Sequence, residues 1–404
     1  MADIPHYDVL IIGGGAGGLS VASALKQVRP QLRTAVVEPK ATHDYQPGWT
    51  LVGGGAMAIE KTRRPMADFM PTTWVKDAVA EFQPDSSEVL LVSGQRLRYE
   101  QLVVAAGLQL DWQRIEGLED ALGRDGVTSN YRGDLAPYTW QCVQNFSGGR
   151  ALFTQPLMPI KCAGAPQKVL YLAADAWRRR GVAADLHFFN QGGAMFGVPL
   201  YARALDGVMA GYGATPHFGH NLVAVDGARR EATFERTDGS GRVTEQYDFL
   251  HVTPPQSAPD FIKSSPLADA AGWVEVDRNS LRHVRYDNVF ALGDCAGTPN
   301  AKTAAAIRKQ FPVLVANLLA ARDGRAVNAG YDGYGGCPLT VERGKVLLAE
   351  FCYDGKVVST LPLDPTRPRR LYWWMKTALF PWMYWHVIVR GRDWKHPAHI
   401  PYGG

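Results

Sequence analysis

A cysteine near the middle of the chain stands where its thiol would be reactive. Cys162 follows an apolar run at 151–154 that predicts a strand, and it precedes a segment at 167–180 whose apolar residues recur at helical spacing. Lys161 adjoins the cysteine, and Lys168 lies one turn into the predicted helix. Positive charge and the positive end of a helix both favour a thiolate over a thiol. The sequence therefore predicts a reactive cysteine here; the alternative is a small buried cysteine in a loop.

The other four cysteines differ in their surroundings. Glycines and a proline flank Cys337, which predicts an irregular loop, and only the fold could bring it to Cys162 across 175 residues. We interpret the remaining three as structural residues: Cys142, Cys295 and Cys352. Five scattered cysteines without a C-x-x-C argue against a secreted disulfide scaffold, a zinc site and a thioredoxin-type motif.

The N-terminal stretch carries a complete nucleotide-binding pattern. Apolar runs at 7–12 and 34–37 predict buried parallel strands with a helix between them. A G-x-G-x-x-G fingerprint lies between the first strand and the helix, at Gly13, Gly15 and Gly18. Glu38 ends the second strand, twenty residues after Gly18. The glycines permit a tight turn near a pyrophosphate, the helix end faces its charge, and the acid can bind a ribose hydroxyl, so we predict a dinucleotide site.

Two later strands are expected in the same unit. A strand at 98–107 ends in small residues up to Gly107, which let the backbone approach a ligand closely, and a strand at 288–292 is followed by Gly293 and Asp294. The other expected elements are two strands of an antiparallel excursion and a helix kinked by Pro312, at 75–82, 89–92 and 301–319.

Composition sets the class of protein. The chain has 404 residues, 46% of them apolar and 20% charged, which is typical of a folded protein of two or three domains. The net charge of +4 does not favour a nucleic-acid partner. A strand begins within about ten residues of the N-terminus, so we expect no signal peptide. No charge-free apolar run reaches roughly 18 residues, so we expect no ordinary membrane-spanning helix.

The segment 371–389 is the most aromatic part of the chain. Seven aromatic residues lie between Tyr372 and Trp385, and we expect Pro381 to split the segment into two short helices. The cations that flank it are Arg367, Arg369, Arg370, Arg390, Arg392 and Lys395. Trp and Tyr favour the membrane–water boundary and cations suit anionic lipid, so we expect this segment to lie on a membrane surface. The alternative is a helix pair packed on the core or on another subunit.

Three of these features resemble the FAD-binding half of the two-dinucleotide-domain flavoprotein disulfide reductases: the fingerprint, the strand end at 105–107 and the Gly293-Asp294 pair. Most of that superfamily binds a nicotinamide through a second fingerprint, which is missing after the 151–154 strand. The glycines of 192–197 have the wrong spacing and are expected in a loop before a helix near 198–209. The resemblance thus implies a flavoprotein that takes its electrons from a sulfur donor.

A wider set of motifs resembles the sulfide:quinone oxidoreductases, and more narrowly their type II branch, which includes the mitochondrial enzyme. The resemblance runs from residue 7 to residue 392 and is carried by stretches at 159–168, 250–255, 293–295, 302–306 and 331–339. It implies an α/β fold with two Rossmann-like dinucleotide-binding domains, one for FAD and one degenerate and NAD-like, plus an amphipathic C-terminal membrane-surface segment. The implied parts are an FAD-binding domain (1–114 and 270–330), a second Rossmann-like domain (115–269) and a C-terminal region (331–404).

The resemblance also assigns roles to residues. It implies that Cys162 and Cys337 form a redox pair whose disulfide, or bridging polysulfide, is attacked by sulfide. Cys337 would carry the persulfide, and Cys162 would be the thiolate that attacks flavin C4a, stabilised by Lys161, Lys168 and the helix end. Cys142 lies where the type I branch has a further cysteine; because we interpret it as structural, we expect no covalent flavin link. The implied FAD contacts are Gly13, Gly15, Ala16, Gly18, Glu38, Gln46, Val79, Gly107, Asp294 and Lys302.

The implied reaction oxidises hydrogen sulfide to persulfide or polysulfide sulfur and passes electrons through FAD to ubiquinone or another membrane quinone. Sulfide, glutathione, sulfite or cyanide would accept the sulfur. We expect a peripheral protein of the bacterial cytoplasmic or mitochondrial inner membrane. Whether it forms a homo-oligomer stays open. We expect the quinone to contact Lys376, Phe380 and Tyr384. Deletion of 367–404 is expected to release the protein from the membrane and to reduce activity with long-chain quinones most. Flavin reduction by sulfide should survive the deletion, provided the truncated chain still folds. The alternatives are a type II NADH:quinone oxidoreductase, which the missing fingerprint disfavours, and a non-catalytic flavoprotein that binds a partner.

Overall fold

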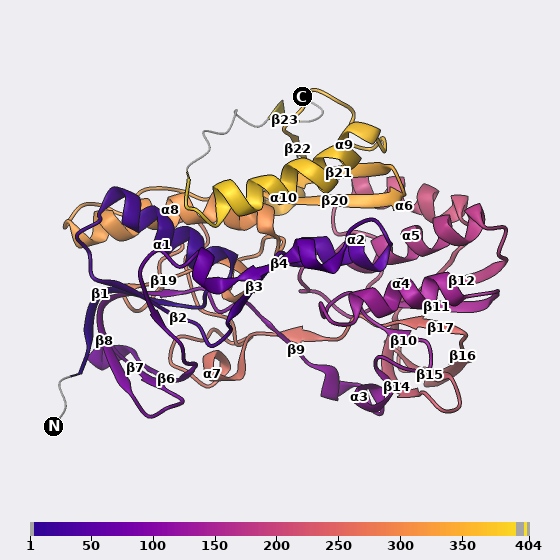
Figure 1. Ribbon diagram of the computed structural model, residues 1–404, viewed down its shortest axis with the longest axis horizontal. Coiled ribbons are helices and arrows are strands. Elements are labelled where there is room, and N and C mark those ends of the chain that lie inside the picture. Colours follow the sequence, from indigo (N-terminus) through magenta and orange to yellow (C-terminus); the bar gives the residue numbers. More distant parts are fainter. Residues whose placement is uncertain (1–3, 393–399, 402–404) are drawn as a thin grey trace.

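The structure is a computed structural model that describes residues 4–392 and 400–401, so the flanking Lys395 lies outside the described residues. Two sheets lie side by side along the longest axis, and the C-terminal helical segment crosses above both of them (Figure 1). Helices cover the sheets, which gives the α/β architecture expected from the sequence. The division into domains at the expected boundaries stays a prediction.

The first sheet holds the glycine fingerprint. Its strands lie in the order β5-β2-β1-β8-β7-β6, and β19 pairs with the other edge of β8. Their bounds are β1 (His6–Ile12), β2 (Thr34–Val37), β5 (Thr73–Val75), β6 (Val79–Gln83), β7 (Glu88–Leu91), β8 (Arg96–Val104) and β19 (Val289–Ala291). β1, β2, β5, β8 and β19 run parallel, whereas β6 and β7 form the expected antiparallel excursion. The central strands are buried on both faces, which explains their continuous apolar sequences.

Two helices pack together on one face of this sheet. α1 (Ala16–Val28) begins in the fingerprint, and α8 (Ala304–Arg322) follows β19. Their apolar side chains share one core with the residues of β1 that point to this face. α8 starts three residues later than expected, is capped by the Thr303 hydroxyl, and continues through Pro312 to Arg322.

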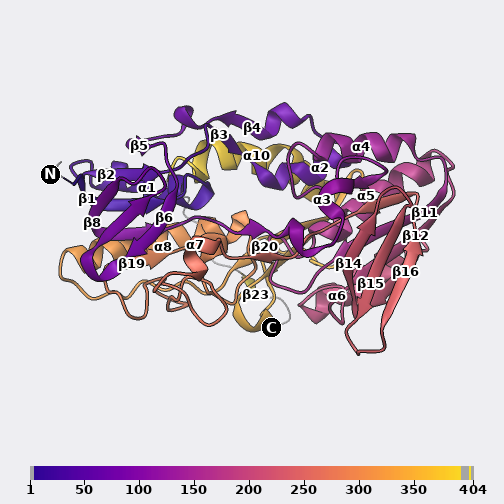
Figure 2. The ribbon, with the colours of Figure 1, turned by 90° about the horizontal axis from the view of Figure 1, so that it is seen from below.

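The second sheet carries the segment with Cys162. Its five strands are all parallel, in the order β10-β17-β11-β12-β13. Their bounds are β10 (Val127–Thr128), β11 (Gly149–Gln155), β12 (Ala184–Asn190), β13 (Thr215–Phe218) and β17 (Phe249–His251). Its helices are α4 (Ala136–Asn145), α5 (Ala165–Arg179) and α6 (Pro199–Gly211), and α6 is the helix expected after the 192–197 loop. The small antiparallel sheet of β14 (His220–Asp226), β15 (Glu231–Arg236) and β16 (Arg242–Gln246) stands at one end (Figure 2).

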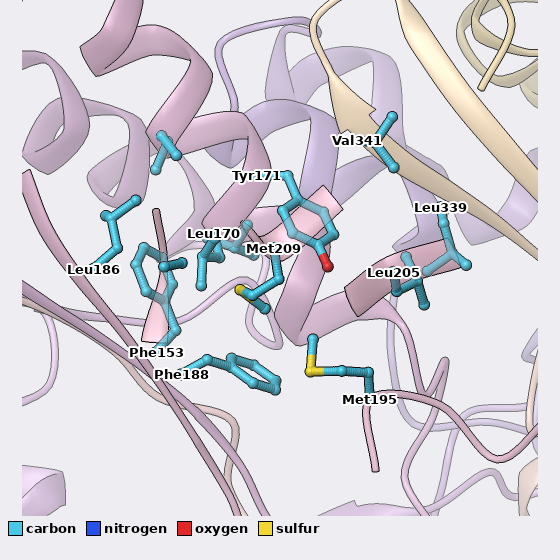
Figure 3. Close-up of a cluster of buried hydrophobic side chains, with 14 of the residues drawn as sticks. Phe153, Leu170, Tyr171, Leu186, Phe188, Met195, Leu205, Met209, Leu339 and Val341 are labelled. Atoms are coloured by element: carbon cyan, nitrogen blue, oxygen red, sulfur yellow. The ribbon is translucent and has the colours of Figure 1, made fainter. Parts of the chain in front are cut away.

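A hairpin near the C-terminus packs on α5. β20 (Gly335–Glu342) and β21 (Lys345–Phe351) pair antiparallel. Figure 3 shows Leu339 and Val341 of this hairpin joining Phe153 of β11 and Tyr171 of α5 in one apolar cluster. Short elements complete the chain: β3 (Thr42–Asp44), α2 (Trp49–Gly53), β4 (Arg63–Pro65), β9 (Gln109–Leu110), α3 (Leu118–Ala121), β18 (Gln256–Ser257), α7 (Asp260–Lys263), β22 (Val358–Ser359) and β23 (Ile400–Pro401).

The prediction of an irregular loop around Cys337 is wrong, because Cys337 lies within β20, opposite Ala349 of β21. A proline is tolerated next to it because β20 pairs with a strand on one edge only. The glycines before it serve close packing: a β-carbon at Gly336 would lie 3.3 Å from the β-carbon of Ala305. They let the strand approach the start of α8.

The split expected at Pro381 is also wrong. α9 (Arg370–Trp374) and α10 (Phe380–Met383) alternate with π-helical turns at Met375–Leu379 and Tyr384–Ile388, and the backbone stays helical at each junction. Pro381 is the second residue of α10, which directly follows the first π-helical turn. The segment is therefore one helical run over 370–388, drawn in yellow in Figure 1. Within residues 4–392 and 400–401, no helix is long and apolar enough to cross a membrane.

Candidate active site

Cys162 and Cys337 come together in the fold. Their sulfur atoms lie 3.5 Å apart, at the turn before α5 and in β20 respectively. Cys162 has a left-handed backbone with φ 54°, and two hydrogen bonds hold its turn. Its N–H donates to the Lys302 carbonyl at 2.9 Å, and its carbonyl accepts from the Ala165 N–H at 2.7 Å. The packing of α5 against the β20–β21 hairpin thus brings together two thiols that their sequence spacing alone could not pair.

Gly164 leaves room for this contact. A β-carbon at this position would lie 3.0 Å from the Cys337 sulfur and 2.2 Å from Leu339 Cδ2. Both distances are shorter than ordinary van der Waals contact. The start of α5 can therefore lie against β20 only if no side chain stands at this position.

Lys168 makes the two sulfurs chemically different. Its ammonium donates to the Cys162 sulfur at 2.9 Å, and the whole side chain is buried. The hydrogen bond from the Cys337 thiol and the charge of Lys168 hold the pKa of Cys162 well below its ordinary value. The hydrogen bond to Cys162 and burial raise the pKa of Cys337 well above its ordinary value. The pair is therefore best described as a thiolate at Cys162 and a thiol at Cys337.

Lys161, predicted to act on the same sulfur, contacts other groups. Its ammonium donates to Gln46 Oε1 at 2.5 Å and lies 5.1 Å from the centre of the Trp49 ring. Burial lowers the pKa of Lys161 to about 8, although the nearby charges of Asp294 and Cys162 oppose that shift. Lys161 therefore connects the cysteine turn to the loop that carries Gln46.

A third lysine is buried beside the cysteine pair. Lys376 comes from the C-terminal helical run, and only 3% of it is exposed. Burial and the like charge of Lys168 lower its pKa to about 7, while the two cysteines act in the opposite direction. The sequence singled out Lys376 only as a quinone contact. The two cysteines come from other segments of the chain, so no residue near Lys376 in the sequence indicates that it lies beside them. The quinone role stays a prediction.

Two polar residues beside the cysteine turn were not singled out from the sequence. Gln256 Oε1 accepts from the Lys161 N–H at 2.8 Å, and the Tyr131 hydroxyl donates to the Lys161 carbonyl at 3.2 Å. Neither belongs to a recognisable motif, so only their contacts in the fold identify them. Cys142 lies on α4 as expected, and burial raises its pKa. The structural interpretation of Cys142, Cys295 and Cys352 stays a prediction.

Comparison with known proteins places this site in a family. Residues 7–136 match the family described as pyridine nucleotide-disulphide oxidoreductase. The mitochondrial sulfide:quinone oxidoreductase of Dictyostelium discoideum is 43% identical over 95% of this chain and 86% of its own length. The mitochondrial sulfide:quinone oxidoreductase of Mus musculus is 40% identical over 98% of this chain and 89% of its own length. The chain belongs to the sulfide:quinone oxidoreductase family. The solved sulfide:quinone oxidoreductase of Aquifex aeolicus shares the fold, with a TM-score of 0.78 at 18% identity over 96% of this chain and 92% of that one.

FAD is the cofactor of this family of flavin-dependent oxidoreductases, and the N-terminal loop fits it. A β-carbon at Gly13 would lie 2.5 Å from the Ala105 carbonyl oxygen, and one at Gly18 would lie 1.8 Å from the Gly13 carbonyl oxygen, so both positions require glycine. A β-carbon at Gly15 would have no neighbouring heavy atom within 4 Å, so this side of the loop is open to a ligand. Glu38 Oε2 accepts from the N–H of the loop at 2.8 Å, which places the predicted ribose-binding acid beside the loop.

Unpartnered polar atoms lie near the other end of the predicted cofactor site. Gln256 Nε2 and Trp49 Nε1 are buried without a hydrogen-bond partner among the described residues, and both side chains lie next to Lys161. Burial raises the pKa of Asp294, and the Lys302 ammonium donates to the Asp294 carbonyl at 2.6 Å. Buried polar groups almost always have partners, so these atoms fit a bound group with polar edges. The other FAD contacts stay predictions: Ala16 at the start of α1, Val79 at the start of β6, and Gly107 after β8.

Proposed function

We propose that this protein oxidises hydrogen sulfide with Cys162 and Cys337 as its redox pair and passes the electrons through FAD to a membrane quinone. One observation carries the proposal: two sulfurs lie 3.5 Å apart, and the ammonium of the buried Lys168 donates to the Cys162 sulfur at 2.9 Å. Thiol–disulfide exchange needs an attacked sulfur and a leaving thiolate, and the leaving thiolate is the better stabilised of the two. The family assignment supports the same substrates.

In the oxidised enzyme the two cysteines are joined by a disulfide or a polysulfide bridge. In the simplest case, HS⁻ attacks the Cys337 sulfur, the S–S bond breaks, and Cys162 leaves as a thiolate. Cys337 then carries a persulfide, and the electron pair of the broken bond resides on Cys162. Lys168 stabilises the leaving thiolate, and the N-terminus of α5 adds to this stabilisation.

The sulfur and the electrons then leave by different routes. A small nucleophile, which is sulfide, glutathione, sulfite or cyanide, takes the outer sulfur of the persulfide and frees the Cys337 thiolate. Bound FAD supplies the two-electron acceptor for the cysteine pair and the donor for quinone. Loss of two electrons from the paired thiolates restores their bond. This residue assignment keeps the sulfur on Cys337 and the electrons on Cys162.

The C-terminal run provides the membrane-facing surface in this proposal. Its exposed residues recur at helical spacing along one face: Leu371, Trp374, Ala378, Trp382, His386 and Arg390. Trp374 and Trp382 are each about half exposed, at 55% and 49%. Two tryptophans and a terminal arginine on one face suit the boundary of an anionic bilayer. We infer a peripheral protein of a bacterial cytoplasmic or mitochondrial inner membrane, which meets its quinone there near the half-exposed Phe380.

Anaerobic titration of the purified protein with sulfide and with NADH tests this proposal. We expect micromolar sulfide to bleach the flavin absorbance and NADH to leave it unchanged. Bleaching by NADH would favour the alternative of an NADH:quinone oxidoreductase. Failure of both reductants would favour a flavoprotein without catalytic activity.

A further inference from the structure

The C-terminal run reaches the FAD loop through a buried hydrogen-bond chain. His43 of β3 is hydrogen-bonded through Nδ1 to the Gly14 carbonyl at 3.1 Å and through Nε2 to the Tyr384 hydroxyl at 2.7 Å. Burial lowers the pKa of His43 to about 4, so the ring is neutral at physiological pH. A carbonyl can only accept, so Nδ1 carries the proton, and the tyrosine hydroxyl must donate to Nε2. The chain therefore has one direction, from Tyr384 through His43 to Gly14.

A second set of contacts joins the end of the same run to α1. The last carbonyls of a helix lack partners within the helix. Here the Ser20 hydroxyl donates to the Ile388 carbonyl at 2.8 Å, and the Ser23 hydroxyl donates to the Val389 carbonyl at 3.0 Å. A β-carbon at Gly391 would lie 2.3 Å from the backbone nitrogen of Ala24, so the chain passes directly over α1. The helix that begins in the fingerprint thus caps the C-terminal run.

We propose that the C-terminal run is a positioning element for FAD, with His43 and Tyr384 as positioning residues that hold the Gly14 loop in its binding conformation. Neither residue belongs to the glycine fingerprint, and the Tyr384 hydroxyl is linked to the loop by hydrogen bonds through His43. Because the same run carries Lys376 and the exposed tryptophans, the cysteine pair, the flavin loop and the membrane-facing surface are fixed to one element. Binding of FAD then stabilises the packing of the C-terminal run on the flavin domain, and this packing strengthens FAD binding by the same free energy.

The rate of FAD release from the holoenzyme tests this proposal without any assay of activity. Flavin fluorescence is followed after dilution of the FAD-loaded wild type, Tyr384→Phe and Ser23→Ala. Loss of one buried hydrogen bond that holds the loop should speed release about fivefold in Tyr384→Phe. Ser23→Ala should change release in the same direction, and it decides the test if Tyr384→Phe does not fold.

Tyr212→Phe is the matched control. The Tyr212 hydroxyl donates to the Val341 carbonyl at 2.7 Å, so this change removes a comparable hydrogen bond between the second sheet's helices and the hairpin. FAD release from Tyr212→Phe should equal that of the wild type. Wild-type release from both Tyr384→Phe and Ser23→Ala would overturn the proposal, and so would equal acceleration in Tyr212→Phe, because that would reflect a general loss of stability.

Discussion

At the scale of single residues, the hydrogen bond between the two cysteines and the charge of Lys168 decide which cysteine is the thiolate. Lys161 and Lys168 are both close to Cys162 along the chain, and their spacing does not distinguish which of them contacts its sulfur. The helical geometry of α5 brings Lys168 back onto the sulfur at 2.9 Å, whereas Lys161 extends to Gln46. The sequence therefore places two cations near Cys162, and the fold shows that Lys168 is the one hydrogen-bonded to its sulfur.

Lys168→Met should slow flavin reduction by sulfide at neutral pH. The charge of Lys168 contributes to the low pKa of Cys162, so its removal should raise that pKa and shift the onset of activity toward alkaline pH. We expect a loss of at least about tenfold, which corresponds to roughly 1.4 kcal/mol of barrier. The measurement is the pH profile of the reduction rate, with Lys345→Met as control, because Lys345 pairs with Glu342 across the turn of the β20–β21 hairpin. An unchanged profile in Lys168→Met would remove Lys168 from the mechanism.

At the scale of elements, the contact of α5 with β20 pairs the thiols. The sequence predicted α5 to within a few residues, because its helical spacing and Pro166 are local signals. It did not predict β20, because the glycines that suggested a loop serve instead to pack the strand against α8. Pairing that depends on long-range packing leaves little local signal in the sequence.

Gly164→Ala should disturb this contact. A methyl group there would meet the Cys337 sulfur and a Leu339 methyl group at distances that force α5 and β20 apart. Such overpacking costs about 1–3 kcal/mol, so we expect a lower Tm together with slower reaction of the pair. Gly207→Ala is the matched control, because Gly207 lies within α6 and its β-carbon would meet no atom within 4 Å. Equal Tm and equal activity in both variants would contradict the geometry given for the pair.

The C-terminal run requires a sharper test than deletion. We expected removal of 367–404 to spare flavin reduction by sulfide, but the run contributes the buried Lys376, Tyr384 and Trp385 to the cysteine site and to the core beside α1. Deletion would therefore remove part of the core beside α1 as well as the surface, so it does not isolate the role of the surface.

Replacement of both exposed tryptophans isolates the surface. Trp374→Gln with Trp382→Gln should weaken binding to vesicles of phosphatidylcholine and phosphatidylglycerol by tenfold or more, because about 1–2 kcal/mol of interfacial burial is lost. Flavin reduction by sulfide should stay near the wild-type rate, while turnover with long-chain quinone in vesicles should fall. Cosedimentation measures the binding. Val92→Gln is the control, since Val92 is exposed directly after β7, in the antiparallel part of the first sheet. Wild-type cosedimentation of the double variant would assign the face to another role.

At the scale of the whole molecule, local patterns predicted most of the first sheet. The strand, glycines, helix, strand and acid from Tyr7 to Glu38 form a continuous unit whose geometry follows from its sequence. The buried position of Lys376 and the link from Tyr384 to His43 could not be predicted in this way, because each joins the C-terminal run to a distant segment. The two sheets and the run thus share one site whose parts are scattered along the chain.

The most direct test of the cysteine pair is the rate of flavin bleaching after anaerobic mixing with sulfide. The account predicts that Cys162→Ser and Cys337→Ser keep their FAD but lose this bleaching, and with it all sulfide-dependent quinone reduction measured without cyanide. Cys142→Ser should bleach at nearly the wild-type rate, because Cys142 lies on α4 outside the pair. Near-normal bleaching in an FAD-loaded Cys162→Ser or Cys337→Ser would contradict the account, and so would loss of activity with release of a formerly covalent flavin in Cys142→Ser.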